Sequence, residues 1–228
     1  MYLSNGIITL LSFKEYIYYN KVMYHFLTLG HDCSPAAALR NLDLREQALP
    51  FDWVVSNVTS IHKCVEENFS RFHINLSFNH NKKRLIDEYG FEYPHDYPLT
   101  NPTLDLSQVG EGAYGEENDK HIIDHWMYFH QIVHEKYKRR IERFLTIIHS
   151  PKPIIVLCRY SLADVFKLKN IFKTVYNKEN VVFINSSDTV YISHDIMNCY
   201  TEKHGIWNDT TVWRECLTAI LESNPMFL

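Results

Sequence analysis

Three short apolar runs constrain the fold of this chain more than any other feature of its sequence. They cover residues 24–29, 154–158 and 181–184, and such runs are typical of strands that are buried on both faces of a parallel sheet. Helical periodicity follows the first run as far as residue 42 and the second as far as about residue 176. This alternation predicts an α/β fold with a mainly parallel sheet flanked by helices, in a three-layer Rossmann-like topology.

The remaining segments are expected to complete one domain. Residues 1–22 are interpreted as an N-terminal extension and residues 23–228 as a single α/β domain, which is long enough to bury a full hydrophobic core. Further helices are predicted at about 58–70, at 120–149 and from 209 or 210 to 221, with a short edge strand at 190–193. Residues 71–118 are the least regular part, and a loop of that length in a compact domain is usually functional or disordered.

Composition narrows the classes of partner and compartment. The formal net charge of −4 disfavours nucleic acid as a partner, because phosphate binding needs a basic surface. No apolar stretch is long enough to span a bilayer. The five cysteines form no CxxC pair, which argues against a disulfide framework or a four-thiolate zinc site. We therefore expect reduced thiols in a cytoplasmic protein that needs no cofactor and acts on a peptide or small molecule.

The segment Gly30-His31-Asp32-Cys33 lies where the first predicted strand turns into a helix. Ser34 is expected to cap that helix and Pro35 to open it. A thiol at a helix N-terminus feels the positive end of the helix dipole, which favours the thiolate, and sites in parallel sheets lie beyond the carboxyl ends of the strands. Cys33 is therefore predicted to be a site residue. Two interpretations stay open for it, a nucleophile and a small buried hydrophobic residue.

A nucleophilic cysteine needs a histidine base, and the chain has 13 histidines. His95 is the preferred candidate because Pro94 and Pro98 stiffen its loop, with an ordinary surface position as the alternative. Asp52 lies among aromatic and apolar residues. It either orients a histidine or fixes the turn at Pro50, and the structural role is slightly favoured.

Two histidine pairs share a helix face by their i, i+4 spacing, His121 with His125 and His130 with His134. Such pairs can bind zinc. The HExxH pattern is absent, however, and no third ligand is specified, so no metal site is predicted.

The predicted long helix also carries a basic cluster. Its members are Lys136, Lys138, Arg139, Arg140 and Arg143. Such a cluster is usually a solvated face, but it could also pair with the acidic residues 105–119 or bind an anionic substrate group. Arg159 directly follows a buried strand and is a better candidate for binding substrate than most of the cluster. No GxGxxG motif or P-loop is present.

Four motifs together carry a resemblance to a known family. They are Leu29-Gly30-His31-Asp32-Cys33-Ser34-Pro35, Pro50-Phe51-Asp52-Trp53, His95-Asp96 and Tyr137-Lys138-Arg139-Arg140-Ile141-Glu142-Arg143-Phe144. Over residues 23–220 the chain resembles uncharacterised proteins of bacteria and large DNA viruses that are labelled as papain-like cysteine peptidases. The resemblance implies Cys33 as the nucleophile, His95 as the base and a later Asp or Asn that orients the base. A papain fold has a helical half and an antiparallel barrel half, whereas the periodicity predicts a parallel sheet, and we expect the fold that the periodicity predicts.

These observations define a candidate site and three candidate functions. The catalytic candidates are Cys33, His95, Asp52 and Asp96, and the substrate-binding candidates are Gly30, His31, Asp32, Trp53 and Arg159. The favoured function is a cysteine-dependent hydrolase or a related acyl-transfer enzyme. The alternatives are a group transferase of the glycosyltransferase kind, which would bind phosphate or sugar at the strand ends, and a binding module without catalysis. If the chain is viral, we expect it in the host cytoplasm or the virion.

Overall fold

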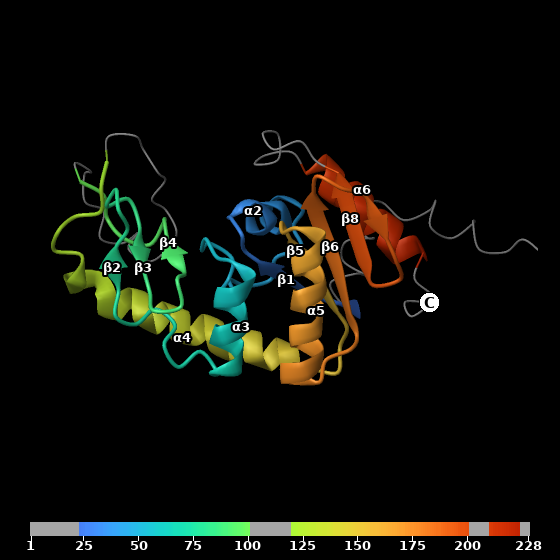
Figure 1. Ribbon diagram of the computed structural model, residues 1–228, viewed down its shortest axis with the longest axis horizontal. Helices are drawn as coiled ribbons and strands as arrows, with labels where there is room; N and C mark the ends of the chain where they lie inside the picture. Colours follow the sequence, from blue (N-terminus) through green and yellow to red (C-terminus); the bar gives the residue numbers. More distant parts are fainter. Residues whose placement is uncertain (1–22, 101–119, 201–209, 224–228) are drawn as a thin grey trace, which may run out of the picture.

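The computed structural model describes residues 23–100, 120–200 and 210–223 (Figure 1). The predicted N-terminal extension and the acidic residues 105–119 lie outside these ranges. Among the residues that the structure describes, no helix is both long and apolar enough to cross a membrane.

A five-stranded sheet with the strand order β1-β5-β6-β8-β7 forms the centre of the fold. Its strands are β1 (His25–Leu29), β5 (Ile154–Cys158), β6 (Val181–Ser187), β8 (Ile196–Tyr200) and β7 (Tyr191–Ile192). The first four run parallel, and β7 pairs antiparallel with β8 at the edge, so the prediction of a mainly parallel sheet is confirmed. The register places Leu29 opposite Cys158 and Cys158 opposite Asn185. The segments that follow these residues therefore meet at the carboxyl edge of the sheet.

Helices cover both faces of this sheet (Figure 1). On one face lie α2 (Ser34–Asn41) and α6 (Thr211–Ser223), and on the other lie α3 (Val58–Glu66), α4 (Met127–His149) and α5 (Leu162–Tyr176). Side chains alternate along β5: Ile155 and Leu157 pack with α2 and α6, whereas Ile154 and Val156 pack with the other three helices. This is the three-layer arrangement that the alternating pattern predicts.

A second, smaller sheet lies beside the N-terminal half of α4, away from the main sheet (Figure 1). It is antiparallel and consists of β2 (Ser77–Phe78), β3 (Leu85–Ile86) and β4 (Glu92–Tyr93). Aromatic rings in edge-to-face or tilted contact pack between this part, α3 and α4: Phe51, Phe69, Phe72, Phe91, Tyr93, Tyr137 and Phe144. The irregular middle of the sequence is thus ordered by aromatic packing rather than by long elements.

The helix α4 begins at Met127 and not at residue 120 as the periodicity predicts. Ile122 instead forms an antiparallel bridge with Leu99, and the Ile123 amide donates to the Pro98 carbonyl oxygen at 3.1 Å. Apolar residues that fit the helical period are therefore used in extended pairing with the segment after β4.

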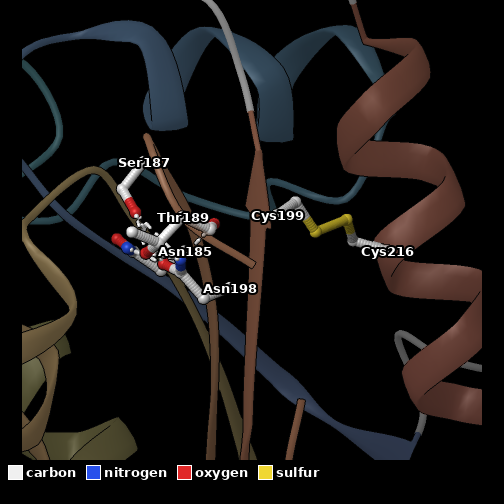
Figure 2. Close-up of a disulfide and its surroundings, with 6 residues drawn as sticks. All are labelled: Asn185, Ser187, Thr189, Asn198, Cys199 and Cys216. Carbon is white, nitrogen blue, oxygen red and sulfur yellow. Dashed lines mark hydrogen bonds between the residues drawn. A yellow bond between two sulfur atoms is a disulfide. The ribbon is translucent and has the colours of Figure 1, made fainter. Parts of the chain in front are cut away.

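A disulfide bond joins Cys199 on β8 to Cys216 on α6 (Figure 2). The expectation that all five thiols are reduced is therefore wrong for this pair, while Cys33, Cys64 and Cys158 are free and buried. The two half-cystines lie 17 residues apart in no recognisable spacing motif, and they meet only because α6 packs on β8.

Candidate functional site at the β1–α2 junction

The turn between β1 and α2 is held by an aspartate cap. Asp32 Oδ1 accepts hydrogen bonds from the Ser34 amide at 2.8 Å and from the Ser34 hydroxyl at 2.6 Å. Since α2 begins at Ser34, Cys33 occupies the cap position, and the Asp32 side chain accepts the amide hydrogen bond that was expected to go to a Ser34 cap. The thiol of Cys33 is therefore fixed at the N-terminal end of a helix and beyond the carboxyl end of β1.

The structure brings Cys33 and His95 together. The sulfur atom of Cys33 lies 3.3 Å from Nε2 of His95, across 62 residues of sequence. Cys33 is only 2% exposed, and the half-buried His95 comes from the loop after β4, here called the His95 loop (residues 94–98). This distance lets a proton pass between the two side chains without an intervening water.

Trp53 covers one side of the histidine. Its ring meets the His95 ring edge-on, with 6.2 Å between the centroids. The guanidinium groups of Arg40 and Arg45 lie 5.2 and 5.5 Å from the centroid of the Trp53 ring. Two cations thus hold the indole in place, which limits the positions that His95 can take.

Asp96 points away from Cys33 into the protein interior. It is fully buried, where its carboxylate accepts hydrogen bonds from the ammonium group of Lys136 and, at 2.6 Å, from the Tyr137 hydroxyl. Burial alone would raise the pKa of Asp96, but the positive charges of Lys136 and Arg140 and the two hydrogen bonds together lower that pKa below its ordinary value. The carboxylate ties the His95 loop to α4.

The basic cluster of α4 is divided by this contact. Lys136 and Arg140 are buried against Asp96 and the Tyr137 ring, whereas Lys138 and Arg139 are exposed. The interpretation of the cluster as a solvated face therefore fails for its two buried members.

Asp52 is also fully engaged by neighbours other than histidine. Its Oδ1 atom accepts from the Thr28 hydroxyl at 2.7 Å, and its Oδ2 atom accepts from the Leu49 amide at 2.9 Å and from Arg45 at 3.1 Å. These contacts fasten the segment before Trp53 onto β1. They correspond to the structural alternative for Asp52.

Arg159 and His31 line a cavity beside the cap of α2. The guanidinium of Arg159 lies 2.8 Å from Asp32 Oδ2 and 3.4 Å from the Ser34 hydroxyl. The cavity has a volume of about 410 Å³ and is lined by residues from the ends of β5 and β6 and the start of α3, among them Asn57, Ser161 and Ser186. It therefore lies where parallel sheets bind ligands.

Gly30 has a packing reason to lack a side chain. A Cβ atom at this position would lie 2.7 Å from the Phe51 carbonyl oxygen and 2.8 Å from the Val54 carbonyl oxygen. The glycine thus permits a close approach of the protein's own backbone, and its role in binding substrate stays a prediction.

Two residues that the sequence analysis did not select support the strand ends. Ser56 donates to the Gly30 carbonyl oxygen and lies 2.9 Å from the Tyr160 hydroxyl. The side chain of Asn185 accepts a hydrogen bond from the Tyr160 backbone N–H at 2.9 Å and donates one to the Tyr160 carbonyl oxygen at 2.8 Å. It also donates to the side-chain oxygen of Asn198, and Figure 2 shows this contact. Asn185 directly follows an apolar run, and this position predicts it at the carboxyl end of a strand, although no role was assigned to it.

Comparisons with known proteins agree with the motif content of this site. A family model described as "Putative papain-like cysteine peptidase (DUF1796)" matches residues 24–196, which include Cys33 and His95. The chain is 24% identical over 221 residues to "Uncharacterized protein R408" of Acanthamoeba polyphaga mimivirus, covering 84% of this chain and 96% of that protein. No solved structure matches the chain.

Proposed function

We propose, from the premise that this chain belongs to the family described as putative papain-like cysteine peptidase, that it is a cysteine-dependent hydrolase or acyl-transfer enzyme. Cys33 would be the nucleophile and His95 the base. The observation that carries the proposal is the 3.3 Å approach of the Cys33 sulfur to His95 Nε2 at the end of a buried parallel strand.

The proposed reaction has two acyl-transfer steps. His95 takes the proton from the thiol, and the thiolate attacks the carbonyl carbon of an amide or ester to form a tetrahedral oxyanion. The oxyanion collapses to a thioester while His95 returns the proton to the leaving group. Water, or another acceptor that is deprotonated by His95, then attacks the thioester and restores the free thiol.

The surroundings of Cys33 support this chemistry in two ways. The thiol lies at the positive end of the α2 dipole, which stabilises both the thiolate and a nearby oxyanion. The Ser34 amide already donates to Asp32, so we assign oxyanion binding to backbone N–H groups between Gly30 and Cys33. The adjoining cavity, with Arg159 in its wall, would hold the rest of a peptide or small-molecule substrate.

Alkylation kinetics test the proposal, with the two other free cysteines as internal controls. Burial raises the pKa values of the Cys64 and Cys158 thiols, so these should react slowly. We expect iodoacetamide at neutral pH to label Cys33 first, as mapped by peptide mass spectrometry. The variant His95→Gln should slow this labelling by at least about 10-fold, and the matched variant His31→Gln should not.

The same experiment can overturn the proposal. Labelling of Cys33 that is no faster than that of Cys64, or that is unchanged in His95→Gln, would remove the case for a nucleophile–base pair. A binding module without catalysis would then be the better description.

A group transferase is the second candidate, and the cavity favours it. Arg159, Ser161, Ser186 and Ser187 place a guanidinium and hydroxyl groups at the strand ends, which suits a phosphate or a sugar. This candidate predicts a rise in melting temperature with millimolar phosphate or a nucleoside diphosphate that is lost in Arg159→Gln. Stabilisation by neither compound would exclude it.

A further inference from the structure

We propose that His73, His130 and His134 form a site for one divalent transition-metal ion, with Zn²⁺ as the expected occupant. One ring nitrogen from each of these residues lies within 4.8 Å of the others. The cluster is distinct from the Cys33–His95 pair, and the inference does not depend on the proposed enzymatic function.

The three rings converge from two separate segments. His73 lies between α3 and β2, where it is completely buried, and His130 and His134 lie one turn apart on α4, where both are half-buried. The His73 ring centroid is 5.1 Å from that of His130 and 5.8 Å from that of His134. The pair on α4 thus gains the third ligand that its sequence spacing does not specify.

Two nitrogen atoms at this cluster lack a hydrogen-bond partner. Among the described residues, no donor or acceptor pairs with Nδ1 of His73 or with Nδ1 of His134, although both atoms are buried. An unsatisfied polar atom in the interior costs about 1–3 kcal/mol, so a fold that retains two of them in one cluster calls for an explanation. A bound metal ion would satisfy both.

The opposite ring nitrogens have the partners that metal-binding histidines typically have. His73 Nε2 lies 2.9 Å from the Tyr97 hydroxyl, and His130 Nε2 lies 3.3 Å from the backbone carbonyl oxygen of His73. A carbonyl acceptor fixes the proton of His130 on Nε2 and leaves the lone pair on Nδ1. Hydrogen bonds of this kind orient an imidazole toward a metal ion.

A positive charge near the cluster is compensated by a carboxylate. The Lys136 ammonium lies over the Tyr137 ring, and the Tyr137 ring contacts the His73 ring. The Lys136 charge is compensated by its ion pair with Asp96.

Three imidazoles favour a zinc-like ion over Mg²⁺ or Ca²⁺, which prefer oxygen ligands. Nitrogen ligands around a tetrahedral zinc ion lie about 3.3 Å apart, so the rings would turn and close from their present nearly parallel stack. His130 and His134 are half-buried, so water can supply the fourth ligand.

The metal ion would brace the His95 loop. Tyr97, which contacts His73, is two residues from His95, and Asp96 between them is bound to α4. A metal that joins His73 to α4 therefore closes a second link between α4 and this loop. We expect bound Zn²⁺ to raise the melting temperature, since ligands that bind only the folded state stabilise it.

A competition titration tests the site. Full-length protein is freed of metal with a chelator, and Zn²⁺ is then added in the presence of a chromophoric chelator. We expect one equivalent to bind tightly, and the variant H130A/H134A to weaken that binding by at least about 100-fold. The matched variant H121A/H125A removes an i, i+4 pair of exposed histidines and should bind as the wild type does.

Co²⁺ in place of Zn²⁺ gives a second, spectroscopic readout. We expect intense visible absorption from a four-coordinate Co²⁺ ion in the wild type and none in H134A, a half-exposed position where the variant should stay folded, as circular dichroism would verify. Zinc binding that is equal in wild type and H130A/H134A, binding that is lost only in H121A/H125A, or binding no tighter than to the competing chelator would each overturn the proposal.

Discussion

Two kinds of histidine environment lie near the His95 loop, that of His95 itself and that of the His73, His130 and His134 cluster, and they differ in the groups that face the imidazole. On one side, Nε2 of His95 faces the thiol of Cys33, a group with a proton to give. On the other side, His73 faces the two imidazoles of α4, which offer lone pairs. The groups next to an imidazole thus decide its chemistry. A thiol neighbour suits proton transfer, and two imidazole neighbours suit coordination of a metal ion. Asp96 lies between them and anchors the loop that both share.

Removal of Asp96 should damage both sites and have the largest effect. The variant Asp96→Ala removes the carboxylate that compensates the buried charge of Lys136, so we expect a loss of about 3–5 kcal/mol in the free energy of unfolding, measured by urea denaturation. Alkylation of Cys33 should slow and zinc binding should weaken in the same variant. If only one of the two readouts changed, Asp96 would not be their common support.

The pH dependence of stability gives a control for this assignment. The pKa of Asp96 is lowered in the folded protein, so its carboxylate stabilises the fold above the unfolded pKa of about 3.9, and this stabilisation is lost as the pH falls through the folded value. The difference in free energy of unfolding between wild type and Asp96→Asn should therefore be largest above about pH 5 and shrink below about pH 4. If this difference in the free energy of unfolding did not depend on pH, the charge of Asp96 would not contribute and its effect would be one of packing and hydrogen bonding alone.

Loss of the disulfide should lower stability and leave both sites intact. Cys199 on β8 and Cys216 on α6 lie 17 residues apart in sequence, and a cross-link that closes about 15 residues is worth about 3 kcal/mol by the chain-entropy argument. We expect C199S/C216S to lower the free energy of unfolding by about that amount. A change in Cys33 alkylation or in zinc affinity in this variant would show that the disulfide is coupled to the sites.

The variant Gly30→Ala should affect the Cys33–His95 site and leave the histidine cluster unchanged. The new methyl group would approach the carbonyl oxygens of Phe51 and Val54 too closely, and neither backbone can yield cheaply. We expect a loss of about 1–3 kcal/mol in stability and a change in the alkylation rate of Cys33. Zinc affinity should stay as in the wild type, and a weakened affinity would contradict the separation of the two sites.

The smallest effect is expected from Trp53→Leu. This change removes the indole between His95 and the guanidinium groups of Arg40 and Arg45, and such cation–π contacts contribute about 0.5–1 kcal/mol each at accessible sites. Thermal unfolding should show a small decrease in melting temperature, with zinc affinity unchanged. A fall in zinc affinity would contradict the separation of the Cys33–His95 site from the histidine cluster.

Most of the main sheet could be predicted from the sequence, and the reasons for the exceptions are physical. The strands β1, β5 and β6 are apolar runs, so periodicity identifies them. Strand β8 contains the buried Asn198, which a pattern-based interpretation assigns to a loop. Its side-chain amide is satisfied by contacts with Asn185, Ser187 and Thr189 that the local pattern does not show. The strands of the small sheet have two residues each, which is too short for any period to show.

The candidate site also has a part that could be predicted from local sequence and a part that could not. The strand–turn–helix context of Cys33 is local, and the sequence alone predicts it. The approach of His95 depends on a loop 62 residues away. The flanking prolines and the family resemblance both pointed to His95, but neither predicts its distance from Cys33. His73 carries no motif and meets His130 across 57 residues, so no sequence signal could have supplied the third ligand. The roles of Cys33 and His95 in catalysis stay predictions until the alkylation experiment is done.

The long helix α4 has a consequence for how the protein unfolds. At 1.5 Å per residue, its 23 residues extend about 35 Å, from the histidine cluster to the back of the main sheet. Val133 near its start and Ile148 near its end belong to one continuous hydrophobic core, and no loop interrupts the helix between them. Because both ends pack on the same core, local unfolding at one end of the helix also exposes core residues that stabilise the other end. Amide hydrogen exchange at the two ends should therefore report the same opening free energy, that of one cooperative unfolding unit.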